Sequence, residues 1–159
     1  MITITVNKGV VSLVNKNWIL EEANKLEFEL GMAAVNPYAV IKSLDIDLIE
    51  CDLGKTTLGQ TIKNSRCYAI LLNNQSNEIM KAFVAWHEIS HVRLHPGLST
   101  AEFRRENLTG LIQGIEAEAN ALAIEMMKRT IDFGETEHMS NYQIIEYLGL
   151  PHTLDHLVI

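Results

Sequence analysis

The chain has few of the residues that mark specialised classes of protein. Its 159 residues include two cysteines, Cys51 and Cys67, which form no C-x-x-C pair, so a disulfide scaffold is excluded. No apolar run approaches the ~20 residues needed to span a bilayer. The first residues, "MITITVNKGVVSLVNKNW", are broken by Asn and Lys and lack the apolar core of a signal peptide. We therefore expect a cytoplasmic protein that does not contact a membrane.

Basic residues are also scarce. The chain has 13 Lys and Arg against 20 Asp and Glu, a formal net charge of −7, whereas phosphate contacts need clustered Lys and Arg. The two adjacent arginines in "EFRREN" are flanked by glutamates. Direct nucleic-acid binding is therefore not expected. With 47% hydrophobic and 21% charged residues, residues 1–159 are expected to form one globular domain with its own core.

The hydrophobic periodicity predicts an α+β fold. Three β-like runs separated by turn-forming segments predict a small antiparallel sheet, and the first six residues alternate like a further short strand. Asn36 and Pro37 are typical of a helix start. The β-like runs cover 46–51, 56–62 and 67–73, and the predicted helices cover 17–32, 36–47, 78–94, 111–130 and parts of 140–159.

The helix predicted for 78–94 contains the pattern H-E-x-x-H, from His87 to His91. Residues four apart share one helix face, so the two imidazoles project together, and this spacing suits one Zn²⁺. Glu88 points to a neighbouring sector, where it can take a proton from water. A shuffled sequence of this composition contains the pattern about 2% of the time. For the motif alone, two partly buried histidines on an apolar face are the alternative.

A catalytic zinc site usually has three protein ligands and one open position. The helix predicted for 111–130 offers Glu116, Glu118 and Glu125. Glu116 falls within its apolar stripe, where a carboxylate is costly unless it is paired or bound to a cation; the alternative is a side chain that reaches out to the helix edge. Glu118 and Glu125 lie at or beyond the edge of the stripe, and a solvated Glu118 is expected. Asn120 shares the face of Glu116 and can hydrogen-bond the second nitrogen of a ligand histidine.

These segments resemble a known family. "FVAWHEISHVRLH" followed by "EAEAN" is similar to the ImmA/IrrE metallopeptidases of bacteria and their mobile elements, which carry H-E-x-G-H and then E-x-x-A-N. The upstream "NPYAVIKSLDIDLIE" is also similar, so the resemblance covers about residues 36–127. Ser90 replaces the usual Gly, and "ALAIEMMKRT" departs from the usual run after A-N.

The resemblance implies a zincin-like α+β fold with an H-E-x-x-H helix and a second ligand-bearing helix. It also implies one Zn²⁺ held by His87, His91 and Glu116, with Glu88 as the catalytic base. Its relatives cleave a helix-turn-helix repressor of a prophage or integrative element, often in response to DNA damage. We therefore expect a cytoplasmic zinc endopeptidase whose substrate is such a repressor.

Other polar residues are candidates for contacts to the oxyanion or the substrate. They are His95, Arg93, Tyr68 and Arg104, and the sequence does not choose among them. His95 comes at the end of the helix, just before Pro96, which favours a structural or substrate-side role over a metal-binding one. If the run 67–73 is an edge strand, an extended substrate can pair with it; a core strand is the equal alternative.

Two alternative functions would use these residues differently. A peptide-deformylase-like hydrolase would use a cysteine such as Cys51 as the third ligand, but the glycines expected around it are missing. A non-catalytic or degenerate peptidase fold would instead regulate a repressor by binding. The three proposed ligands and the base are all present, which counts against degeneration.

Overall fold

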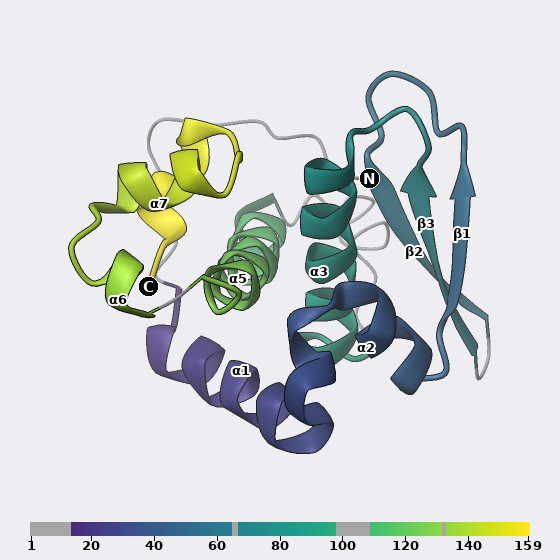
Figure 1. The fold of residues 1–159 in the computed structure, drawn as a ribbon. Coiled ribbons are helices and arrows are strands. Elements are labelled where there is room, and N and C mark those ends of the chain that lie inside the picture. Colours follow the sequence, from purple (N-terminus) through teal and green to yellow (C-terminus); the bar gives the residue numbers. More distant parts are fainter. Residues whose placement is uncertain (1–13, 65–66, 98–108, 132) are drawn as a thin grey trace.

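A computed structural model describes residues 14–64, 67–97, 109–131 and 133–159 of the protein (Figure 1). Helices and a three-stranded sheet make up the α+β fold that the sequence predicts. The strand predicted for residues 1–6 lies outside the described residues. The elements are α1 (Lys16–Leu30), η1 (Gly31–Val35), α2 (Pro37–Ser43), β1 (Asp47–Cys51), β2 (Gly59–Asn64), β3 (Cys67–Asn73), α3 (Glu78–Leu94), α5 (Thr109–Lys128), α6 (Phe133–Thr136), α7 (Asn141–Tyr147) and η2 (His152–Leu157).

Short-range capping explains where the first helices begin and end. The side chain of Asn15 accepts a hydrogen bond from the Trp18 amide and caps α1. Gly31 ends α1 with a φ of 56°, which glycine tolerates because it has no Cβ. Asn36 accepts hydrogen bonds from two amides of α2, and Pro37 is its first residue. The start predicted at Asn36 and Pro37 is therefore confirmed.

The sheet has the strand order β1-β3-β2. β2 runs antiparallel to β3, but β1 runs parallel to it, so the prediction of a purely antiparallel sheet is wrong for β1. The segment between β1 and β2 does not form a hairpin, because the Asn73 side chain donates to the carbonyls of Gly54 and Thr57 and folds this segment into a loop. The apolar β3 takes the central position, where Ile70 and Leu72 are fully buried.

Helix α3 lies between the sheet and α5 (Figure 1). All eight residues from Phe83 to Ser90 are buried, because β2, β3 and α2 cover parts of its surface and α5 covers another. The H-E-x-x-H motif falls in this stretch, so its polar side chains are enclosed by protein. Any charge on them must be matched by neighbouring groups.

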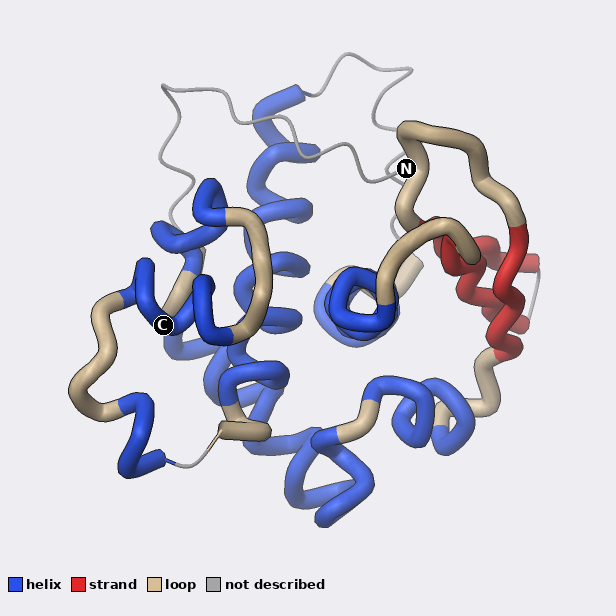
Figure 2. Tube along the Cα trace, turned by 45° about the horizontal axis from the view of Figure 1, so that its top comes forward, coloured by secondary structure: helices blue, strands red, loops and turns tan. Residues whose placement is uncertain are grey.

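Helix α5 is the second central element. Its residues from Ala121 to Met126 are all buried, and it contacts α1, α3 and η2. In Figures 1 and 2 the C-terminal helices lie on one side of the α3–α5 pair and the sheet lies on the other. No helix among the described residues is both long and apolar enough to cross a bilayer.

Candidate metal centre

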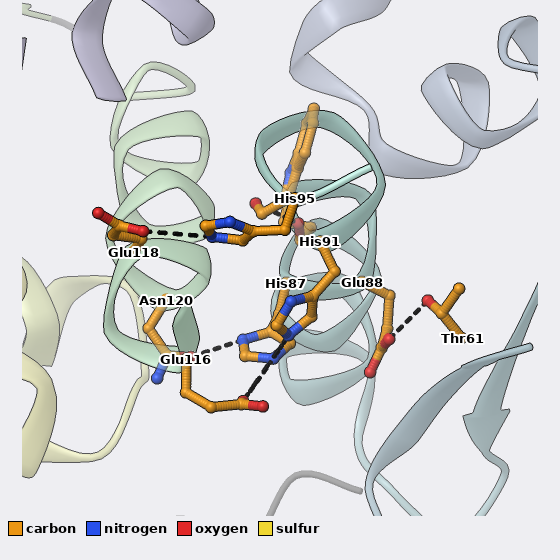
Figure 3. A network of polar contacts seen from close by, with 10 residues as sticks. Thr61, His87, Glu88, His91, His95, Glu116, Glu118 and Asn120 are labelled. Carbon is orange, nitrogen blue, oxygen red and sulfur yellow. Dashed lines mark hydrogen bonds and ion pairs between the residues drawn. The ribbon is translucent and has the colours of Figure 1, made fainter. Parts of the chain in front are cut away.

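Three side chains from α3 and α5 converge on one point, and we call them the His–His–Glu cluster (Figure 3). They are His87, His91 and Glu116. The Nε2 atoms of the two histidines are 2.9 Å apart. Glu116 Oε2 lies 3.2 Å from His87 Nε2 and 3.7 Å from His91 Nε2. The side chain of His87 is fully buried, and that of Glu116 is 25% exposed, so the cluster opens to solvent on one side.

The spacing of these donors fits a metal ion. Four ligands placed about 2.0 Å from a tetrahedral zinc are about 3.3 Å from one another. The three separations in the cluster, 2.9, 3.2 and 3.7 Å, lie around this value. Two ring nitrogens and a carboxylate oxygen are also the ligand types that zinc accepts. Three protein donors leave a fourth position free.

Asn120 fixes the orientation of the His87 ring. Its Oδ1 lies 2.7 Å from His87 Nδ1. An amide oxygen can only accept, so the hydrogen sits on Nδ1 of the neutral ring and the lone pair of Nε2 points into the cluster. Metal-ligating histidines usually have such a partner on their second nitrogen. The expectation that Asn120 hydrogen-bonds a cluster histidine agrees with this contact.

The electrostatics of the cluster follow from its charges. Burial alone would lower the pKa of His87, but the carboxylates of Glu116 and Glu88 outweigh it and raise that pKa above its ordinary value. Burial alone would raise the pKa of Glu116, but its contacts with His87 and His91 outweigh burial and lower it. The carboxylate therefore stays ionised and attracts positive charge, which a proton or a metal cation can supply.

Glu88 lies on the same helix but faces β2. Its side chain is close to the histidine pair, on the side away from Asn120 (Figure 3). Glu88 is only 3% exposed, and its Oε2 accepts a hydrogen bond of 2.6 Å from the Thr61 hydroxyl. Thr61 was not among the residues expected from the sequence. Nothing in the local pattern distinguishes it, since the contact depends on how β2 packs against α3.

His95 faces Glu118 instead of the cluster. Its Nε2 lies 3.3 Å from Glu118 Oε2, and its ring meets the Trp18 ring edge to face. Burial and the nearby His91 lower the pKa of His95 to about 4, so the ring is neutral at neutral pH. The position agrees with a structural role. Glu118 lies at the edge of its helix face and is partly solvated: its side chain is 20% exposed, and partial burial raises its pKa.

The structure does not bring Arg93 to the cluster. Its guanidinium pairs with Glu22 and Glu29 of α1, at 2.6 and 3.0 Å. Arg93 is two residues beyond His91, a rotation of about 200° around α3, so the two side chains point in different directions. Tyr68 lies on β3, with the Lys63 ammonium 5.4 Å from its ring centre, and its role stays a prediction. Arg104 lies outside the described residues.

Several other residues of types that can bind a metal lie away from the cluster in the described part of the chain. Cys51 is at the end of β1 and does not belong to the cluster. Glu125 is buried and pairs with Lys128 of its own helix and with Arg129, the residue just after the helix. The β3 strand is central, so the edge-strand alternative for 67–73 is wrong; β1 and β2 are the edges. The remaining histidines, His138, His152 and His156, are exposed.

Comparisons with known proteins agree with this geometry. The model of a peptidase family, M78, described as the IrrE N-terminal-like domain, matches residues 41–149. The chain is also 26% identical, over 124 residues, to "Uncharacterized immunity region protein 2" of Bacillus phage phi105, covering 78% of this chain and 71% of the phage protein. No solved structure matches the chain significantly. The matched region contains the H-E-x-x-H helix and the Glu116 helix, so this chain belongs to the IrrE N-terminal-like family of peptidases.

Proposed function

We propose that the protein is a zinc-dependent endopeptidase that cleaves a helix-turn-helix repressor of a prophage or integrative element. The observation that carries this proposal is the convergence of His87, His91 and Glu116, with the carboxylate of Glu88 beside them. The membership of a peptidase family supports the reaction class. The similarity to a phage immunity-region protein supports the genetic setting.

In this proposal the His–His–Glu cluster holds the ion, and Asn120 keeps the His87 ring in the orientation that binds it. A bound Zn²⁺ would polarise the carbonyl of the scissile peptide bond and lower the pKa of water. Glu88 accepts a proton from the attacking water as its oxygen bonds to the carbonyl carbon, and then delivers a proton to the departing amide nitrogen. The free carboxylate oxygen of Glu88, Oε1, performs both transfers.

The edge of β2 offers a place for an extended substrate. The carbonyl of Leu58, just before β2, accepts a hydrogen bond from the Asn73 amide. In an antiparallel pair, backbone groups alternate between the partner strand and the free side. Gly59, Thr61 and Lys63 therefore turn their backbone groups to an edge of the sheet that no strand among the described residues covers. A peptide that pairs with this edge lies next to Glu88, which Thr61 contacts.

The substrate assignment rests on genetic setting and charge. The protein has a net charge of −7, which suits a positively charged partner such as a DNA-binding repressor better than DNA itself. In the cytoplasm, cleavage of such a repressor would release the genes that it controls. The trigger, as in the related metallopeptidases, would be DNA damage.

The proposal requires a helix-turn-helix repressor from the same genetic element, and the test is co-expression of the protein with that repressor. Wild-type protein should produce repressor fragments on a blot, above all after DNA damage. Glu88→Gln, which keeps the shape but removes the base, should lose cleavage by on the order of 10²–10⁴-fold while retaining zinc. An intact repressor under both resting and damaged conditions contradicts the proposal. If Glu88→Gln still relieves repression without cleavage, the protein acts by binding.

A further inference from the structure

The carboxylate of Glu88 is held by a residue of the sheet. The Thr61 hydroxyl donates to Glu88 Oε2 over 2.6 Å, within the normal range of a hydrogen bond between two oxygens. Thr61 is on β2, 27 positions away from Glu88 in the chain. Glu88 is 3% exposed, and a buried carboxylate without a donor is costly. The hydroxyl therefore both stabilises Glu88 and sets the direction of its carboxylate.

The fit between β2 and α3 makes this contact possible. Two residues along a strand span about 6.7 Å, and four residues along a helix span about 6 Å. Gly59 and Thr61 therefore follow the same spacing as Val84 and Glu88. A Cβ built on Gly59 would overlap Val84 Cγ1, and it would lie 3.5 Å from Glu88 Oε1. The glycine thus brings the strand close enough for Thr61 to reach the carboxylate.

We propose that Thr61 is a positioning residue for Glu88, an inference that rests on the proposed peptidase function. The hydroxyl binds Oε2 and holds the side chain in one orientation, so that Oε1 stays available for proton transfer. Without this donor the carboxylate can rotate and spends part of its time turned away from the attacking water. Loss of the contact should therefore slow turnover without weakening the binding of substrate or metal.

The activity test uses the repressor from the same genetic element, labelled at both ends, as substrate for zinc-loaded protein. Thr61→Val, which has nearly the same shape but no hydroxyl, should lower kcat by about 10- to 100-fold. KM and zinc affinity should stay unchanged. Thr61→Ser, which keeps the donor, should restore most of the rate. Ile49→Val is the matched control, because Ile49 is a strand residue, 47% exposed, on β1 and away from the β2 edge, and it should behave as wild type.

A second measurement tests the contact without metal or substrate. Melting temperatures are compared for wild type, Thr61→Val, Glu88→Ala and the double variant, all in excess chelator. If the hydroxyl supports the carboxylate, Thr61→Val should change Tm differently when Glu88 is present and when it is absent. Equal changes in the two backgrounds would overturn the contact. Thr61→Ala replaces Thr61→Val in both tests if the valine variant does not fold.

The outcomes separate the two proposals. Wild-type protein that leaves the repressor intact overturns the proposed function, and this assignment with it. If wild-type protein cleaves the repressor and Thr61→Val has an unchanged kcat, the positioning role of Thr61 is overturned but the proposed function is not. An equal loss of rate in the valine and serine variants also overturns it, because serine retains the hydroxyl.

Discussion

Replacing Glu116 or Glu118 by alanine tests which of these two carboxylates, two positions apart on α5, binds the metal. Two positions correspond to a rotation of about 200°, so the side chains leave the helix in different directions. Glu116 Oε2 is 3.2 Å from His87 Nε2, whereas Glu118 Oε2 is 3.3 Å from His95 Nε2. We expect only the first variant to lose zinc.

The size of the difference follows from the contacts. Glu116→Ala removes the only carboxylate of the His–His–Glu cluster and leaves two histidine rings. Removing a partner that merely orients a ligand typically costs 10- to 100-fold in metal affinity. Loss of a direct ligand should exceed this range, a change of more than about 100-fold, or about 2.7 kcal/mol. Glu118→Ala should change the affinity by less than about 3-fold, because this carboxylate points away from the cluster and faces a different histidine, His95.

The assay is a zinc titration in competition with a chromogenic chelator, on chelator-treated wild type and both variants. Circular dichroism of the metal-free proteins checks that each variant is folded. Wild type should take up about one Zn²⁺ per chain. If Glu118→Ala loses the metal while Glu116→Ala keeps it, the assigned helix face is wrong. If wild type binds no transition metal, the cluster does not hold one.

Three further predictions use the same contacts. Asn120→Ala should weaken zinc binding by about 10- to 100-fold, because the His87 ring loses its acceptor; unchanged affinity in the same titration would contradict this. Zinc affinity should fall as the pH drops through the raised pKa of His87, about 10-fold per pH unit for each proton displaced, since the metal binds only the deprotonated ring. In Glu116→Ala this fall should begin at a lower pH, because the variant lacks a carboxylate that raises the pKa of His87. A pH profile of zinc affinity with the same onset as wild type would show that Glu116 does not raise this pKa. Gly59→Ala should reduce the free energy of unfolding by about 1–3 kcal/mol, because the added methyl overlaps Val84; a urea unfolding curve like that of wild type would contradict the close approach.

The helices and their faces follow from local sequence. The predicted helix 78–94 has the bounds of α3 (Glu78–Leu94). Pro96 and Gly97 stop it in the sequence, and in the structure the Asn77 side chain caps its first turn by accepting from the Met80 amide. The spacing of four between His87 and His91 put both rings on one face in any helix. Glu116 was expected as their partner on two grounds: a carboxylate on an apolar stripe is costly unless it is paired or bound to a cation, and Glu116 matches the first residue of the E-x-x-A-N motif in the family that the chain resembles.

Other features depend on contacts between elements that are distant in the chain. The parallel pairing of β1 with β3 depends on the loop that Asn73 holds in place, whereas the turn-forming residues alone predicted an antiparallel sheet. The burial of Glu118 against His95 depends on how α3 crosses α5. The residues on one face of a helix are set by its own sequence, but which of its edge residues become covered depends on the neighbouring helix.

The sequence by itself determined the motif, its helix, the family and the three residues that can hold a metal, since each rests on spacing within one element or on the chemistry of a single side chain. Only the tertiary structure decided which strand lies beside Glu88 and which residue binds its carboxylate. Thr61 reaches Glu88 because Gly59 lets β2 approach α3 closely. Thr61 and Glu88 are 27 positions apart in the sequence. The hydrophobic periodicity within one strand or one helix does not determine how two such distant elements pack against each other.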